Sequence, residues 1–380
     1  MAVYGPNGSG KSNIVRALQF MRTAMLNTDA VNSPTVKNLN LQPFRLNVNS
    51  RKEPSFFELV FRNPETETDY RYGFEANHTA VVSEWLFECA NRGRRTTERK
   101  LFSRELGKDI DFTNEVPKPI RAFKSTVPET ILALPYLANN NYDEATLITE
   151  FVKNKLLILT SDNLDAITEP AYKRLRKYPA LHKRTVEIMQ DMGTAIKTIE
   201  FQDIEIKREE LIKAGLPETL ADQVLQRPHT AVSSKHDVYD DDGNVVDEDT
   251  FVMSDNESLG TQKILPLITL FLDAEAAGMT VVMDEFGSSL HPFITKTLVE
   301  LFFKHAAHAQ LLVMTHETYL LNQDINLSPG QLWMVEKDRL QQSTLTCLAD
   351  YSPRRDARLD KQYLEGRFGA VPIVYKGLAD

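Results

Sequence analysis

The sequence contains very little cysteine. Cys89 and Cys347 are the only two in 380 residues, and no motif spacing relates them. Two isolated cysteines cannot form the disulfide framework that supports small secreted domains. This scarcity predicts a reducing compartment and a fold that depends on an ordinary hydrophobic core.

Long apolar runs are missing too. The longest, "ILPLITLFL", is well short of the roughly 20 residues that span a bilayer, so it is typical of a buried helix. The first residues do not form a basic stretch followed by an apolar one, which argues against a secretory leader. We therefore predict a cytoplasmic protein without membrane contact.

Nor is there an excess of positive charge. The 44 lysines and arginines are outnumbered by 53 aspartates and glutamates, which gives a formal net charge of −9. A generally basic coat is excluded, so nucleic acid would have to meet a local patch. A hydrophobic content of 42% with 26% charged residues is typical of a soluble globular protein, and the length allows one large domain or two ordinary ones.

A strong motif is present at the start, in "MAVYGPNGSGKSN". Gly5, Gly10, Lys11 and Ser12 have the spacing of a phosphate-binding loop, in which backbone N–H groups close around phosphate oxygens and the next helix adds its positive end. Lys11 would reach the terminal phosphates, and Ser12 would give a hydroxyl to Mg²⁺. A plain strand-to-helix turn has no need of that lysine and serine. The predicted nucleotide-binding positions are Gly5, Asn7, Gly8, Ser9, Gly10, Lys11, Ser12 and Asn13.

Three further segments carry polar residues next to apolar runs. In "TVVMDE" a buried strand ends at Asp284, a candidate Mg²⁺ ligand, and Glu285, which would position or deprotonate the attacking water. In "QLLVMTH" a second strand leads to His316, a candidate γ-phosphate contact. In "NESLGTQ" Ser258 and Gly260 open a helix whose N-terminus suits an anion. Each segment taken alone has an ordinary structural explanation: the acidic pair could be a surface edge, the histidine a core residue and the serine a helix cap. Because all three occur together with the phosphate loop, we favour a nucleotide-binding site.

The chain divides into three predicted segments. Residues 1–126 hold a short strand at 2–4, the loop, a helix and a β-rich stretch with hairpin-like spacing, which predicts an antiparallel sheet. Residues 127–227, including "ATLITEFVKNKLLIL", are predicted to be helical, without the sustained heptads of a coiled-coil arm. Residues 228–380 are predicted to begin with a hairpin that turns at Asp242-Gly243 and to continue as alternating helices and strands.

The acidic hairpin "HDVYDDDGNVVDEDTFVM" raises the alternative of a calcium loop. With Gly243 as the loop glycine, the first ligand position falls on Val238, which has no side-chain oxygen. A solvated turn is therefore the preferred interpretation.

The order of these motifs (loop, long insertion, "SLGTQ", "VVMDE", "SSLHP" and "TH") resembles that of ABC-type ATPases. More narrowly, the chain is similar to the bacterial single-head ABC ATPases of phage-defence and abortive-infection systems, a class that includes the overcoming-lysogenisation-defect ATPases. "PFRLNVNSRKEPSFFELVF", "QLWMVEKD" and "KQYLEGRFGAVP" look like segments of that family in the same order, and the resemblance is weakest across 125–225. It implies an α/β fold: a P-loop NTPase head of the ABC type with an antiparallel β subdomain and a helical insertion.

In that family two heads sandwich ATP, and each site joins one head's phosphate loop to the other head's signature segment. The resemblance implies that Asp284, Glu285 and His316 complete the site in cis. It also implies that Ser258 and Gly260 touch the γ-phosphate in trans. With one motif set per chain, a working ATPase would be a homodimer or a higher even-numbered oligomer, with ATP as the dimer switch.

By the same resemblance, Ser289 would lie in the loop between the two sites. The chain also departs from the family pattern. The family has further strands before the phosphate loop, with contacts to adenine, and this sequence holds none of them. The glutamine that senses Mg²⁺ and the γ-phosphate has no clear equivalent, and Gln42 is the candidate. The signature "SLGTQ" fits defence and repair ATPases better than transporters.

The predicted function is a Mg²⁺-dependent ATPase that hydrolyses ATP, dimerises on ATP and acts as sensor or regulator of a separate effector, a nuclease or toxin, in antiviral defence. The alternative is a DNA-repair or chromosome-associated ABC ATPase that clamps nucleic acid through two basic clusters, although charge runs are more often solvated faces. A transporter subunit ranks third, because the stretch between loop and signature is longer than a compact transporter head needs. The basic clusters are Arg92, Arg94, Arg95 and Arg99, and Lys173, Arg174, Arg176, Lys177, Lys183 and Arg184.

Overall fold

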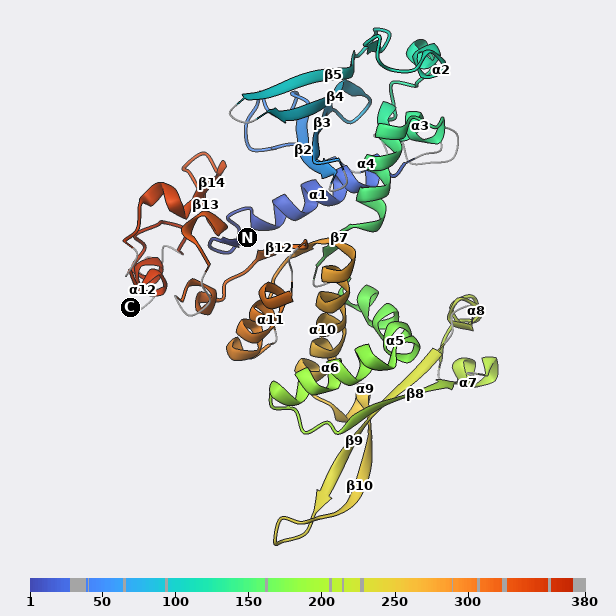
Figure 1. The fold of residues 1–380 in the computed structure, drawn as a ribbon, viewed down its shortest axis with the longest axis vertical. Helices are drawn as coiled ribbons and strands as arrows, with labels where there is room; N and C mark the ends of the chain where they lie inside the picture. Colours follow the sequence, from blue (N-terminus) through green and yellow to red (C-terminus); the bar gives the residue numbers. More distant parts are fainter. Residues whose placement is uncertain are drawn as a thin grey trace.

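The computed structural model of the chain contains three β-sheets, of six, five and three strands. Helices cover both faces of the six-stranded sheet, and the two smaller sheets lie on opposite sides of it (Figure 1). The structure describes residues 1–27, 39, 41–63, 66–92, 95–160, 163–204, 207–213, 215–225, 229–288, 290–305, 308–322, 327–354 and 357–371.

The six-stranded sheet positions the phosphate loop. In spatial order its strands are β14 (Ser343–Cys347), β13 (Leu332–Lys337), β1 (Ala2–Tyr4), β12 (Gln310–Met314), β11 (Thr280–Met283) and β7 (Leu156–Leu159). All neighbouring pairs are parallel except β13 and β14, which are antiparallel. The carboxyl ends of β1, β11 and β12 therefore meet at one edge of the sheet.

Strand β1 lies inside this sheet although it has only three residues. It pairs with β12 on one side and β13 on the other, and all its side chains are buried. Ala2 and Tyr4 belong to one hydrophobic core and Val3 to the other, as the alternation of side chains along a strand requires. The short strand predicted before the loop is thus confirmed, and its continuous apolar character suits a strand buried on both faces.

Two hydrophobic cores form on the two faces of the central sheet. The first is built with α5 (Thr168–Lys177), α6 (Pro179–Asp191), α10 (Leu259–Ala277) and α11 (Pro292–His305). The second is built with α1 (Lys11–Met25), α3 (Ala133–Asn139), α4 (Asp143–Asn154) and the five-stranded sheet. The helices and strands predicted between the signature and residue 335 are confirmed in this arrangement.

The five-stranded sheet is an antiparallel meander, as predicted from the β-rich stretch. Its strands are β2 (Ser55–Asn63), β3 (Thr68–Ala76), β4 (Val81–Arg92), β5 (Arg95–Glu105) and β6 (Asp111–Phe112). Phe57 of β2 stacks on Phe20 of α1 with ring centroids 4.9 Å apart. This aromatic pair joins the sheet to the helix that follows the phosphate loop.

The segment 127–227 differs from its helical prediction at two places. Helix α4 ends at Asn154, and the following "LLIL" forms β7, which pairs with β11. A run of four apolar residues has no periodicity that distinguishes a strand from a helix. This run becomes a strand because its backbone pairs with that of β11. The prediction of one continuous helix over "ATLITEFVKNKLLIL" is therefore wrong. A further strand, β8 (Thr198–Ile204), also lies in this segment.

The predicted hairpin around Asp242-Gly243 is confirmed. Strands β9 (His229–Tyr239) and β10 (Val245–Val252) pair antiparallel, with β8 on the other side of β9, and the hairpin projects beyond the helices (Figure 1). The Asp240 carboxylate accepts the backbone N–H groups of Asp242 and Asn244 at 3.0 and 2.8 Å, so this acid stabilises the turn. Within the described residues no cluster of metal-ligating side chains is found.

Shorter helices complete the described part of the chain. None of its helices is long and apolar enough to cross a bilayer. Both cysteines are free, as predicted. The bounds of the shorter helices are α2 (Lys118–Arg121), α7 (Arg208–Lys213), α8 (Glu218–Leu225), α9 (Met253–Asn256) and α12 (Leu359–Leu364).

Candidate nucleotide-binding site

The glycine-rich loop between β1 and α1 is folded tightly on itself. The Lys11 ammonium group donates hydrogen bonds to the backbone oxygens of Gly5 and Pro6 at 2.6 and 3.2 Å. A Cβ atom at Gly5 would lie 2.6 Å from both Ser9 Oγ and the Val335 backbone oxygen. Only glycine fits at this position, because any side chain would collide with the loop and with β13.

The other two glycines of the motif have backbone conformations that side chains disfavour. Gly8 has a φ of 76° and Gly10 a φ of 107°. A Cβ atom at Gly10 would lie 2.5 Å from Ser343 Oγ, whereas one at Gly8 would meet nothing within 4 Å. Gly8 therefore leaves its backbone open to an incoming group.

The loop offers donors of the kind that a phosphate needs. Gly10 is the N-cap of α1 and has no side chain to satisfy the N–H groups of the first turn, where Lys11 and Ser12 lie. The buried hydroxyl of Ser9 has no hydrogen-bond partner among the described residues. An anion bound here would receive several N–H groups and the positive end of a 15-residue helix.

Ser343, on β14, supports the loop and was not found in the sequence. Its hydroxyl donates to the Ser9 backbone oxygen at 2.6 Å, and it packs against Gly10. No local motif marks this serine, since it is separated from Ser9 by 334 positions. Only the pairing of β14 with β13, and of β13 with β1, brings it to the loop.

The acidic pair lies at the carboxyl end of β11. Asp284 directly follows the strand, and its backbone N–H donates to the Leu159 oxygen at 2.8 Å. The Asp284 carboxylate in turn accepts the N–H of Glu285 at 3.1 Å. Glu285 is exposed and has a φ of 53°, a left-handed conformation that costs a side-chain-bearing residue about 1–3 kcal/mol.

Thr315 joins the ends of three strands. This residue is completely buried, and its N–H donates to the Val3 oxygen at 3.1 Å. Its hydroxyl donates to the Phe286 oxygen at 2.9 Å, just after the acidic pair. His316 follows at once, so the histidine lies at the same sheet edge as Glu285 and the loop.

The electrostatics of the site reflect this proximity. Burial lowers the pKa of Lys11, and the negative charges of Asp284 and Glu285 oppose that shift. Burial also lowers the pKa of His316, the positive charge of Lys11 lowers it further, and Glu285 and Asp284 oppose both. The imidazole is therefore neutral at neutral pH, and its pKa responds to the charges of Lys11, Asp284 and Glu285.

A cavity of about 870 Å³ adjoins the loop. Asn13, Arg16 and Phe20 of α1 form one of its walls, and Gln42 and Phe44 line it from the segment before β2. Lys337, Gln341 and Ser343 line it from the end of β13 to the start of β14. Gln42 and Asn13 therefore line the same cavity.

The signature segment lies elsewhere. Ser258 is the N-cap of α10, where its exposed hydroxyl accepts the N–H of Thr261 at 3.1 Å, and Gly260 is in the first turn. This end of α10 lies beside α9 and the three-stranded sheet, apart from the N-terminus and α1 (Figure 1). The structure therefore does not bring Ser258 and Gly260 to the phosphate loop of the same chain. Ser289 lies outside the described residues.

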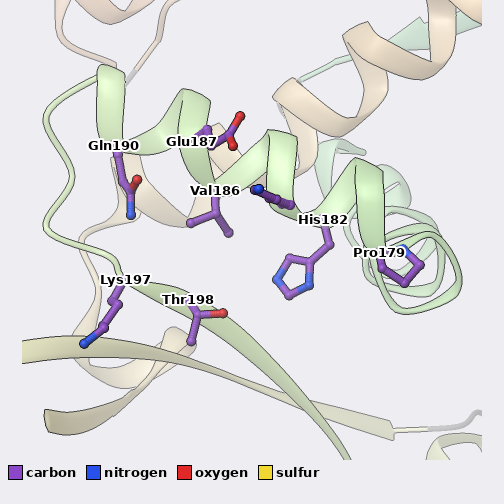
Figure 2. A pocket seen from close by; sticks show the side chains of 8 residues that line it. Pro179, His182, Val186, Glu187, Gln190, Lys197 and Thr198 are labelled. Carbon is purple, nitrogen blue, oxygen red and sulfur yellow. The ribbon is translucent and has the colours of Figure 1, made fainter.

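A second cavity, of about 380 Å³, lies between α6 and β8. His182, Gln190, Lys197 and Thr198 are among its lining residues (Figure 2). Lys197 is already engaged by Asp237 and Glu248, at 2.7 and 2.6 Å. None of the predicted nucleotide-binding residues lines this cavity, so it is separate from the candidate site.

Five members of the basic clusters form ion pairs with acidic residues within the described part of the chain. Arg174 pairs with Asp273, with Nε and Oδ2 2.8 Å apart, and Arg176 pairs with Asp203. In the first cluster Arg99 pairs with Glu88 and Glu115. Lys173 and Arg184 lie 3.7 and 3.3 Å from Glu169 and Glu187. Arg94 and the side chains of Arg92 and Arg95 are outside the described part.

A phosphate loop after a central strand of a mixed α/β sheet, with acidic and histidine-bearing strand ends beside it and an antiparallel β subdomain, defines the fold of a P-loop NTPase head. The chain belongs to the family described as "AAA domain, putative AbiEii toxin, Type IV TA system", whose profile matches residues 1–127 and 171–322. No match was found among curated proteins.

Three of the solved structures that resemble the chain are heads of SMC proteins. An SmcHead bound to the C-winged helix domain of ScpA has 16% identity and a TM-score of 0.44, with 92% of this chain and 91% of that chain covered. The SMC head domain from Thermotoga maritima has 16% identity and a TM-score of 0.38, with coverages of 91% and 89%. An Smc head with an extended coiled coil, bound to the C-terminal domain of ScpA derived from Pyrococcus furiosus, has 12% identity and a TM-score of 0.36, with coverages of 96% and 92%.

Proposed function

We propose that this protein binds ATP with Mg²⁺ at the loop after β1 and hydrolyses it in a dimer. The observation that carries the proposal is the convergence of Lys11, Asp284, Glu285 and His316 at one sheet edge, where the charges influence one another. A merely structural turn would not need a lysine, two carboxylates and a neutral histidine together. The family assignment supports the same conclusion.

The residues present suit a magnesium triphosphate. Backbone N–H groups of Gly8, Gly10, Lys11 and Ser12 and the Lys11 ammonium would hold the phosphates. The Ser9 hydroxyl, which has no partner among the described residues, suits the same anion. Ser12 and Asp284 offer the oxygen ligands that Mg²⁺ prefers, and the bound ion would neutralise charge on the phosphates.

Glu285 and His316 would serve hydrolysis. The exposed carboxylate of Glu285 is suited to orient or deprotonate a water molecule beside the terminal phosphate. The neutral imidazole of His316 would donate a hydrogen bond to that phosphate. Gln42 and Asn13 border the same region, and Gln42 is our proposal for the residue that senses the bound ion.

The nucleoside would occupy the cavity of about 870 Å³ beside α1. The aromatic ring of Phe44 and the planar guanidinium groups of Arg16 and Arg45 line this space, and such groups stack on purine rings. The cavity begins at Asn13, so a nucleotide whose phosphates lie in the loop would reach it directly.

Dimerisation would complete the site. Because Ser258 and Gly260 lie apart from the loop of their own chain, they would meet the γ-phosphate held by a second copy. Ser289 would lie between the two sites. ATP would then favour the dimer, since only the triphosphate is gripped from both sides.

We propose that this ATP-dependent dimer acts in the cytoplasm as a sensor or regulator of a separate effector, a nuclease or toxin, in antiviral defence. The family description includes "putative AbiEii toxin, Type IV TA system", which supports the link to defence in this proposal. The alternative, a clamp on nucleic acid in repair or chromosome maintenance, is less favoured because three arginines of the basic clusters already pair with acidic residues of the same chain. Tight, salt-dependent binding of duplex DNA in the presence of MgATP would reverse that preference.

Glu285→Gln tests the central proposal. This variant should bind ATP but not release phosphate, and it should accumulate as a dimer in MgATP, because the bound triphosphate persists. Light scattering with and without MgATP measures the dimer, and a phosphate-release assay measures turnover. Glu300→Gln, an exposed glutamate on α11, is the matched control and should behave as the parent. Normal phosphate release by Glu285→Gln would contradict the assigned role.

A further inference from the structure

A polar cluster outside the nucleotide site joins the β9–β10 hairpin to the start of α10. The Glu257 carboxylate accepts a hydrogen bond from Ser234 Oγ at 2.5 Å, and the same oxygen lies 2.7 Å from His236 Nε2. Ser234 is fully buried, and the side chains of His236 and Glu257 are only 16% and 10% exposed. The His236 ring also packs on Phe251 of β10, with ring centroids 4.6 Å apart.

A serine, a histidine and a glutamate in contact could suggest a nucleophilic triad. Two observations exclude that chemistry. The Ser234 hydroxyl lies 3.2 Å from His236 Nε2 but donates to the Glu257 carboxylate at 2.5 Å, so its proton is directed at the carboxylate and not at the imidazole. Ser234 also has no exposed surface, so no substrate could reach it. The cluster therefore has a structural role: it fixes the segment before α10 to strand β9.

The cluster of Ser234, His236 and Glu257 adjoins the signature segment that begins at Ser258. Glu257 directly precedes Ser258, and its backbone oxygen accepts a hydrogen bond from Gln262 Nε2 at 3.0 Å. The side chain of Glu257 is thus anchored to β9 while its main chain is anchored to the first turn of α10. On the hairpin side of this segment, the N–H of Val252 donates to Asn256 Oδ1 at 2.9 Å.

We propose that Ser234, His236 and Glu257 form a latch that orients Ser258 for the phosphate held by a second copy of the chain. They are positioning residues, and the inference rests on the proposed ATP-driven dimer. Two donors on one nearly buried carboxylate oxygen leave Glu257 little freedom, and Ser258 follows it by one residue. The three-stranded sheet therefore controls the position of Ser258, which would contact the phosphate of the second chain. The phosphate loop, in contrast, is positioned by the strands of the central sheet.

The test compares two substitutions of His236 in the Glu285→Gln background. His236→Gln keeps a side-chain N–H within reach of Glu257, whereas His236→Phe keeps an aromatic ring against Phe251 but has no donor. If the latch acts through its hydrogen bonds, His236→Phe should weaken dimerisation in MgATP about tenfold, and His236→Gln should keep most of it. Both should bind a fluorescent ATP analogue as monomers with the affinity of the parent.

Glu257→Ala and a control complete the test. Glu257→Ala removes the acceptor and should lower dimerisation at least as far as His236→Phe. Glu248→Ala, a glutamate on β10 outside the cluster, should dimerise like the parent. The latch is overturned if Glu257→Ala dimerises normally, if His236→Phe performs better than His236→Gln, or if monomer nucleotide affinity falls in parallel. A Glu285→Gln parent that stays monomeric in MgATP would instead overturn the proposed function, and the latch with it.

Discussion

The individual glycines of the phosphate loop are required for different physical reasons. Gly5 has no space for a side chain, and Gly10 has neither the space nor a favourable conformation. Gly8 has space, so its glycine is needed only for a φ of 76° and for access to the backbone. These differences allow backbone strain to be separated from ligand binding in experiments.

Gly8→Ala should cost stability and nucleotide affinity, whereas Gly107→Ala should cost stability alone. Both glycines have a left-handed φ, 76° and 78°, with nothing within 4 Å of an added Cβ. Each substitution should lower the free energy of unfolding by about 1–2 kcal/mol, measured by chemical denaturation. Only Gly8→Ala should weaken ATP binding, measured by calorimetry, because its methyl group would stand where the phosphates approach. Equal affinity in the two variants would contradict the loop assignment.

The titration of His316 should report the charges around it. We expect its pKa to lie below the ordinary value of 6.5, because burial and Lys11 disfavour the charged imidazole. Lys11→Ala removes a positive neighbour and should raise this pKa, whereas Glu285→Gln removes a negative one and should lower it further. NMR titration of the histidine ring protons measures the shift, and His316→Gln identifies the resonance. A pKa that is the same in all three proteins would show that these groups are far apart in solution.

At the scale of the elements, a buried carboxylate connects the β subdomain to the helices above the central sheet. The side chain of Glu84, on β4, is completely buried and accepts the N–H groups of Ala133 and Leu134 at 2.7 and 2.9 Å. It also accepts the Tyr72 hydroxyl at 2.9 Å and pairs with Arg104 at 2.9 Å. Glu84 thus caps α3 while it ties three neighbouring strands to that helix.

Glu84→Ala should be among the most destabilising substitutions in the chain. It leaves the buried Arg104 without its carboxylate partner and the start of α3 uncapped, so we expect a loss of about 3–5 kcal/mol in the free energy of unfolding. Lys108→Ala breaks an exposed ion pair with Glu105 and should change stability by less than about 1 kcal/mol. Urea denaturation measures both. A similar effect of the two variants would contradict the role of Glu84 as a connector.

The elements also show where prediction from the sequence ended. The hairpin at Gly243 and the helix start at Ser258 were predictable, because a turn residue and a helix cap act locally. Strand β7 was not, because four apolar residues after α4 could continue the helix. Its state depends on β11, which lies more than a hundred residues further along the chain.

At the scale of the whole molecule, the phosphate loop and the signature segment are carried by different parts of the fold. The loop depends on the central strands, with Ser343 supporting it from β14. Ser258 is held beside the three-stranded sheet through Glu257. Each half of the proposed site is therefore folded in the monomer, and in the proposed dimer a second copy would supply what is missing from the first.

Ser258→Arg should prevent the ATP-driven dimer without affecting the monomer. The exposed N-cap position tolerates a larger side chain, so folding should persist with a small loss from the missing cap, about 1 kcal/mol. The added bulk and charge would block the approach of a second chain. Size-exclusion chromatography in MgATP measures the dimer. Asp242→Arg at the hairpin tip, which changes the charge by two units instead of one, is the control. Dimer formation by Ser258→Arg would show that the signature lies outside the interface.

The sequence by itself determined the features that depend on neighbouring residues: the glycine loop, the short strand before it, the helix cap at Ser258 and the acidic strand end at Asp284. These follow from local sterics, hydrogen bonding and apolar patterning. The tertiary structure decided which distant residues meet: Ser343 on the loop, β7 at the sheet edge, Thr315 between three strands and Glu257 on the hairpin. Such contacts join residues that lie from 21 to 334 positions apart in the chain, and no local pattern encodes them.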